Sequence, residues 1–184
     1  MSYEATHYLN MFLGAGAILL QVLSVAVLLA LCFGPKKNKI VAYADQHFLP
    51  IGFAIAFFSS LFSLVYSEII GFLPCYLCWY QRVFLFPLVF MFGTALWDKD
   101  RKIIRYALPL IIVGFVISVY QNLGYYFGGE SNAPCDASGI SCYQQLVSEF
   151  GGYISIPMLS LTVYFALLVL CLAVHFHTRR LAKN

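Results

Sequence analysis

Five apolar runs, each close to the length of a membrane-spanning helix, account for most of the chain. A helix needs about 20 mostly apolar residues to cross the hydrocarbon core of a bilayer. The runs cover approximately residues 9–33, 48–71, 78–97, 103–127 and 154–176. Because 61% of the 184 residues are hydrophobic, only 10% are charged and the mean hydropathy is +0.81, an ordinary soluble domain is excluded. The sequence predicts an all-α, polytopic membrane protein with five spans.

The lysines and arginines are unevenly distributed among the segments that join these runs. All eleven except Arg82 lie in residues 36–39, 99–105 and 179–183, whereas the start of the chain, the turn around Cys75 and the segment 128–153 contain none. Because positive charge concentrates on cytoplasmic loops, we expect the N-terminus and both cysteine-bearing segments to be extracytoplasmic and the C-terminus to be cytoplasmic. No basic stretch precedes the first run, so we expect a spanning helix there rather than a cleaved signal peptide.

Two cysteines with C-x-x-C spacing stand where the third run begins. Cys75 and Cys78 follow Pro74, which suits a turn or a first helical position, and we expect a helix to start near Cys78. The unpaired amides and the positive dipole end of that helix favour the thiolate form of a nearby cysteine. The motif predicts a redox-active pair; a structural zinc half-site, an inert disulfide and a chance pair fit the same short motif.

Arg82 is the one lysine or arginine outside the three basic segments, and it lies inside the apolar run 78–97. It follows Cys78 by four residues and therefore shares a helix face with it. Its guanidinium stays charged and can stabilise a thiolate or donate a hydrogen bond to an electron-rich ligand oxygen. An ionisable group at this depth is costly and indicates a function; the alternative is a side chain that snorkels to the headgroups.

A second cysteine pair, Cys135 and Cys142, lies in a segment rich in Gly, Ser, Asp and Pro. Closing a disulfide over so short a loop is sterically possible. Apolar residues recur at helical spacing over residues 143–150, which predicts a short helix on the membrane surface. The alternative for this loop is an ordinary structural disulfide.

The four cysteines on one predicted face are more informative together than either pair alone. An oxidising compartment favours disulfides over zinc, and no metal site is predicted. A four-thiolate zinc site that joins both segments stays open as an alternative, but it lacks the two close C-x-x-C motifs that usually build one. Cys32 and Cys171 lie within the runs, where we expect small, buried, apolar residues.

Two stretches of the sequence carry a resemblance to a known family. The run YSEIIGFLPCYLCWYQR at residues 66–82 resembles the signature of the DsbB/BdbC disulfide bond formation proteins, particularly the BdbC branch, and ISIPMLSL at residues 154–161 resembles the same branch. The similarity covers roughly residues 48–176. It implies a four-helix redox domain over residues 48–184, preceded in residues 1–47 by an additional N-terminal transmembrane helix and a basic cytoplasmic loop.

The resemblance also implies an activity. A protein of this family is a protein-disulfide:quinone oxidoreductase of the bacterial cytoplasmic membrane, which re-oxidises a DsbA/BdbD-like thioredoxin-fold thiol oxidase and passes the electrons to a membrane quinone, ubiquinone or menaquinone. By position, Cys135 and Cys142 match the pair that meets the partner, with Cys135 as the site of the mixed disulfide. Cys75 and Cys78 match the pair beside the quinone, with Cys78 as the donor to the ring, and Arg82 matches the arginine of the quinone site.

The chain departs from the family pattern in two ways. The first helix lies outside the usual four-helix core. Some DsbB members carry a histidine near the outer end of the helix before the second pair, whereas this chain has Gln121 in that neighbourhood and all its histidines elsewhere. Gln121 and Glu68 are therefore further candidates for the quinone site.

Three other functions stay open, and no nucleic-acid partner is expected. A vitamin K epoxide reductase-like enzyme uses a similar bundle with a C-x-x-C and differs in its quinone derivative. A transporter or channel needs polar residues through its helix interiors, and here few are found at depth. A scaffold with two static disulfides shows no thiol exchange.

Overall fold

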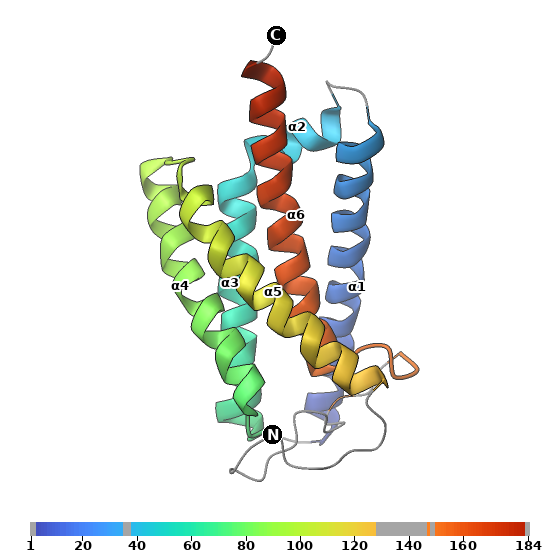
Figure 1. Cartoon of the computed structure of the whole chain (residues 1–184). Coiled ribbons are helices and arrows are strands. Elements are labelled where there is room, and N and C mark those ends of the chain that lie inside the picture. The colour runs from blue at the N-terminus through green and yellow to red at the C-terminus, as the bar shows by residue number, and fades with distance from the viewer. Residues whose placement is uncertain (1–2, 35–37, 128–146, 148–149, 183–184) are drawn as a thin grey trace.

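The computed structural model describes residues 3–34, 38–127, 147 and 150–182, and its long elements are all helices (Figure 1). Five of these helices are long and apolar enough to cross a membrane, as the sequence predicts. The prediction of a polytopic all-α protein is confirmed. The elements are α1 (Tyr3–Phe33), α2 (Lys39–Gln46), α3 (Phe48–Leu64), η1 (Val65–Ile70), α4 (Tyr76–Asp98), α5 (Ile103–Phe127) and α6 (Ile156–Ala182).

The two ends of the bundle differ in chemistry. One end, which we call the cysteine end, carries the start of α1, the turn before α4, the end of α5 and the start of α6; the opposite end, which we call the basic end, carries α2, the α4–α5 connection and the C-terminus (Figure 1). Arg101 and Lys102 lie in the α4–α5 connection, and Lys39 begins α2. These basic residues therefore lie together at the end of the bundle opposite the cysteine end.

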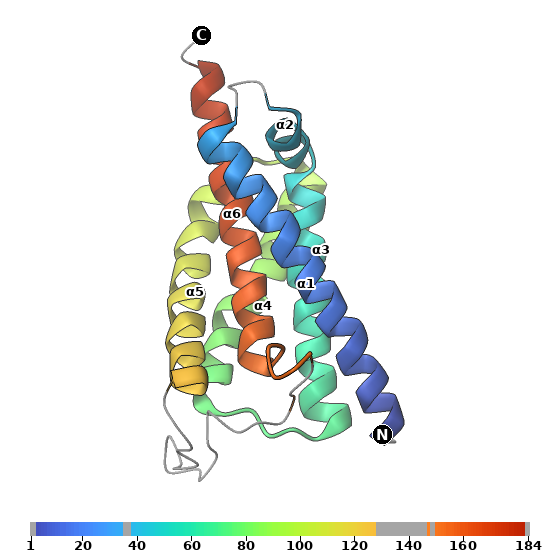
Figure 2. The ribbon, with the colours of Figure 1, turned by 90° about the vertical axis from the view of Figure 1, so that its right-hand side faces the viewer.

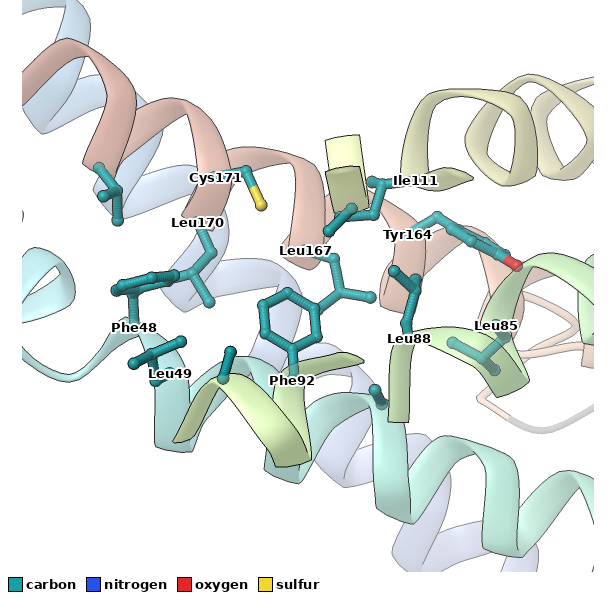
Figure 3. Packing of buried hydrophobic residues seen from close by; sticks show 14 of the residues in the cluster. Phe48, Leu49, Leu85, Leu88, Phe92, Ile111, Tyr164, Leu167, Leu170 and Cys171 are labelled. Carbon is teal, nitrogen blue, oxygen red and sulfur yellow. The ribbon is translucent and has the colours of Figure 1, made fainter. Parts of the chain in front are cut away.

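The last helix, α6, lies at the centre of the bundle. It packs against α1, α2, α3 and α5, and half of its most apolar stretch is buried, against 17% of that of α1. Figure 3 shows its residues Tyr164, Leu167 and Cys171 among Phe92 of α4 and Ile111 of α5. α1 runs obliquely across this central helix in the view of Figure 2. The core is therefore organised around the C-terminal span.

A π-helical turn and a glycine shape the connection between α3 and α4. The turn η1 is followed by its C-cap Gly71, whose φ of 88° is a left-handed conformation that glycine adopts without strain. The chain then runs without regular structure to Cys75, which is the N-cap of α4. Single π turns are often found next to functional sites, and here the turn directs the chain back toward the start of α4.

Three details differ from the expectations or were not part of them. Cys32 is exposed on the surface of α1 rather than buried, whereas Cys171 is buried as predicted. The short helix α2 begins after Asn38, whose side chain accepts a hydrogen bond from the amide of Ile40. Asp45 of α2 pairs with Arg101 at the basic end. The helix predicted over residues 143–150 falls largely outside the described residues.

Candidate functional site

Cys75 and Cys78 lie together at the start of α4. Cys75 caps the helix, which begins at Tyr76 and therefore slightly earlier than expected. The two sulfur atoms are 3.1 Å apart, and both cysteines are free in this structure. Cys75 is buried and Cys78 is partly buried. The pair is thus a dithiol whose sulfurs are close enough to form a disulfide with a small movement.

A buried amide from α5 contacts both sulfurs. The Nε2 atom of Gln121 lies 3.6 Å from the Sγ atoms of Cys75 and Cys78. Its Oε1 atom accepts a hydrogen bond of 2.9 Å from Gln81 Nε2, and both glutamine side chains are buried. The hydroxyl of Tyr164 donates to the backbone oxygen of Gln81. The dithiol therefore rests on a network of amides that links α4, α5 and α6.

Arg82 is buried and forms hydrogen bonds with α3. Only 7% of the residue is exposed. Its Nε atom donates to Ser63 Oγ at 2.9 Å and its Nη2 atom to the Ser63 carbonyl oxygen at 2.7 Å. Its guanidinium carbon lies 5.4 Å from the centre of the Trp79 ring. Within the described part of the chain it has no salt bridge to a carboxylate, and its Nη1 atom makes no hydrogen bond.

A cavity of about 430 Å³ opens beside this arginine. Its polar lining includes Cys78, Gln81, Arg82 and Ser63, and most of the remaining wall is apolar. The volume lies within the range of about 300–1,000 Å³ that small-molecule sites occupy. An apolar chamber with a few convergent polar groups at one side is typical of a site for a mostly apolar ligand with a polar head.

The structure brings together some of the predicted site residues and not others. Cys75, Cys78, Arg82 and the candidate Gln121 form one cluster. Glu68 is exposed, accepts a hydrogen bond from Ser67 and does not line the cavity.

The second cysteine pair and the metal alternative cannot be placed in this cluster. Cys135 and Cys142 lie outside the described residues, although the chain leaves α5 and returns to α6 at the cysteine end (Figure 1). Among the described residues no group of three or more His, Cys, Asp or Glu side chains could hold a metal ion. The four-thiolate zinc alternative includes Cys135 and Cys142 and stays untested.

Comparison with known proteins shows the family of this chain. The family model for disulfide bond formation protein DsbB matches residues 45–175. The chain belongs to the DsbB family. Disulfide bond formation protein C of Bacillus subtilis is 37% identical over 74% of this chain and 94% of that protein. No solved structure gave a significant match.

Further relatives extend the similarity to other bacteria. Probable disulfide formation protein C 2 of Bacillus anthracis is 38% identical over 68% of this chain and 88% of that protein. A probable disulfide formation protein of Metapseudomonas resinovorans is 33% identical over 67% of this chain and 86% of that protein. Membership of the DsbB family implies a disulfide-forming oxidoreductase in a membrane with five candidate spans. The family match begins at residue 45, so α1 lies outside it.

Several residues of this DsbB-family site are not predicted from the sequence. Ser63, Gln81 and Tyr164 were not singled out, although each contacts the cluster directly or through one partner. The available signal was a polar side chain inside an apolar run, the argument that identified Arg82. Applied to Gln81, it would have marked both members of the Gln81–Arg82 pair.

Proposed function

We propose that this chain oxidises a dithiol partner outside the cytoplasm and transfers the electrons through Cys75 and Cys78 to a membrane quinone. The single observation that carries the proposal is that Cys78 and a buried arginine line the same cavity. Cys78 supplies a redox group to the chamber, and Arg82 supplies a fixed positive charge with a hydrogen-bond donor still available.

The residues present fit a quinone. A buried guanidinium is costly unless hydrogen bonds satisfy its donors, and among the described residues no salt bridge to Arg82 is found. A quinone oxygen is an acceptor that Nη1 of Arg82 can bind, and the apolar walls suit the rest of a lipid-soluble molecule. Ser63 holds the guanidinium by two hydrogen bonds and therefore fixes the direction of the free donor.

The redox step balances with this donor and this acceptor. Oxidation of the Cys75–Cys78 dithiol to a disulfide releases two electrons and two protons, and a quinone that accepts both becomes the hydroquinone. Cys78 lines the cavity and Cys75 lies behind it, so Cys78 is the thiol that faces the acceptor. Gln121 donates to both sulfurs and stabilises the reduced pair before the transfer.

The second cysteine pair connects this site to the partner. In the proposal, a dithiol of a thioredoxin-fold thiol oxidase attacks the Cys135–Cys142 disulfide through a mixed disulfide at Cys135. The Cys135–Cys142 dithiol then reduces the Cys75–Cys78 disulfide by exchange, so that no electrons are lost between the pairs. A strongly oxidising partner, at roughly −120 mV in the type case, needs an acceptor at least as oxidising. A membrane quinone meets that need.

The orientation belongs to the same proposal. The cysteine end faces the extracytoplasmic side and the basic end faces the cytoplasm of a bacterial cell, because cytoplasmic loops carry the positive charge. In this orientation the chain sustains disulfide formation in exported proteins.

The test uses purified protein, a reduced thioredoxin-fold oxidase and a quinone whose reduction is followed by absorbance. Cys75→Ser and Cys78→Ser should abolish quinone reduction, and Cys135→Ser should abolish the mixed disulfide with the partner. Cys32→Ser is the matched control, because Cys32 is exposed on α1 and distant in sequence from both pairs. Normal turnover by Cys75→Ser would show that the proposed electron route is wrong.

A further inference from the structure

One wall of the cavity beside Arg82 is formed by residues that lie outside the part of the chain matched by the DsbB family. Five residues of α1 line it: Phe12, Leu13, Gly16, Ala17 and Leu20. The family match begins at residue 45, so all five lie outside it. The cavity is therefore a composite of the family core and the added helix.

The two sides of the cavity differ in polarity. The groups that α3 and α4 contribute include Ser63, Cys78, Gln81 and Arg82. The five α1 residues are all apolar. A ligand with a polar ring and an apolar chain is bound best with its ring toward α4 and its chain toward α1, because this orientation buries apolar surface against apolar surface.

Two polar anchors hold α1 in place on either side of its cavity-lining stretch. Nearer the N-terminus, the hydroxyl of Tyr66 in η1 donates to Asn10 Oδ1 at 2.6 Å, and both residues are buried. Further along, Gln21 donates to Thr162 Oγ1 at 2.7 Å and accepts from the hydroxyl of Tyr153 at 2.9 Å. Hydrogen bonds between helices are a principal means of helix association in lipid.

Neighbouring glycines show which face of α1 is packed and which is open. A Cβ atom at Gly14 would lie 2.8 Å from the ring of Phe150, so this face is in close contact with the segment before α6. A Cβ atom at Gly16 would meet nothing within 4 Å. The Gly14 side of α1 is thus in close contact with the bundle, whereas the space beside Gly16 is unfilled.

We propose that α1 forms the binding wall for the isoprenoid tail of the quinone, so that this chain selects among quinones by their tails as well as by their rings. The inference rests on the proposed function and deepens it. The ring lies at the side of Cys78 and Arg82, and the first part of the tail lies along Leu13, Gly16 and Leu20.

The test fills the free volume at Gly16. Gly16→Phe adds a ring at a residue that lines the cavity, and its Cβ atom would meet nothing within 4 Å. Ala15→Phe is the matched control: it adds the same ring one position away, at an exposed residue that does not line the cavity. Leu20→Ala is a second variant that removes apolar contact instead of adding bulk.

Binding is measured without turnover, by quenching of tryptophan fluorescence. Trp79 lies beside Arg82, whereas Trp97 is 89% exposed at the basic end, so the titrations use the Trp97→Phe background. The probes are a dimethoxy-methyl-benzoquinone and a methyl-naphthoquinone, each offered without a tail and with an isoprenoid or decyl tail.

We expect Gly16→Phe to weaken binding of the tailed probe by about tenfold or more and to change the affinity for the tail-less probe by no more than about twofold. The reason is that the added ring would occupy the space proposed for the tail and would not contact the quinone ring. Leu20→Ala should weaken the tailed probe alone, by roughly three- to fivefold. Ala15→Phe should match the parent protein.

Four outcomes would overturn the inference. The first is unchanged affinity of Gly16→Phe and Leu20→Ala for the tailed probe, and the second is an equal loss for probes with and without a tail. If the parent protein binds the rings and the tail adds nothing, only the role of α1 fails. If the parent protein binds none of the four probes, the proposed function fails together with it.

Discussion

Replacing Gln121 with leucine tests whether the buried amide tunes the redox pair. Gln121 Nε2 is a donor to both sulfurs at 3.6 Å, and the side chain is almost fully buried. Both thiols of the reduced pair are uncharged, and a typical hydrogen bond between neutral groups contributes about 0.5–1.5 kcal/mol. For a two-electron couple about 30 mV corresponds to 1.4 kcal/mol, so loss of the amide should change the potential by roughly 10–30 mV.

The direction follows from which form the amide stabilises. The hydrogen bonds in the structure are made to the reduced pair. Gln121→Leu therefore destabilises the dithiol relative to the disulfide, and the reduction potential should become more negative. The assay equilibrates the protein with dithiothreitol redox buffers, traps free thiols with a maleimide and counts the labels by mass. The Cys135→Ser and Cys142→Ser background leaves one redox pair to titrate.

Asn122→Leu is the matched control for this measurement. Asn122 is a buried amide on the same helix, and its Nδ2 atom donates to the carbonyl oxygens of Ser118 and Pro157 at 2.8 Å, not to sulfur. Both variants remove a buried hydrogen-bonding group and should lower the free energy of unfolding by about 1–3 kcal/mol. Only Gln121→Leu should change the potential. An unchanged potential, or an equal change in Asn122→Leu, would refute the reasoning.

Two further substitutions have expected outcomes of different kinds. Arg82→Ala should raise the KM for quinone by roughly 10- to 100-fold in steady-state assays, since a charge-assisted hydrogen bond contributes about 1.5–3 kcal/mol. Gly114→Ala should lower the free energy of unfolding by about 1–3 kcal/mol in thermal or denaturant unfolding. The reason is that a Cβ atom at Gly114 overlaps the ring of Tyr164, whose hydroxyl is bonded to the Gln81 carbonyl.

Each of these substitutions has a control in the same chain. Arg101→Ala removes an arginine at the basic end, where it pairs with Asp45, and should leave the KM for quinone unchanged. Gly93→Ala places its Cβ atom 3.3 Å from the Phe53 ring, a contact that a small movement relieves, and should change stability less than Gly114→Ala. Equal effects of variant and control would contradict the roles given to Arg82 and Gly114.

The number and order of spanning helices could be predicted from the sequence because length and apolarity are properties of each segment alone. The same holds for the C-x-x-C motif at the start of α4 and for Arg82 as an isolated charge inside a span. These features need no knowledge of how the helices pack.

The contact of Gln121 with the sulfur atoms of Cys75 and Cys78 depends on how α5 is rotated about its axis relative to α4. In a membrane the lipid-facing side of a helix is as apolar as the buried side, so the sequence pattern does not reveal which face turns inward. The error at Cys32 has the same cause, because a small apolar residue suits either environment. The contribution of α1 to the cavity could not be found for this reason either.

The central place of α6 has a consequence for biosynthesis. The ribosome makes this helix after α1, α2, α3 and α5, yet all four pack against it. Earlier spans can enter the membrane one by one as stable helices, but their common packing partner is made only after all of them. Chains that stop before α6 should therefore be inserted and helical but unassembled, and they are expected substrates for membrane proteases.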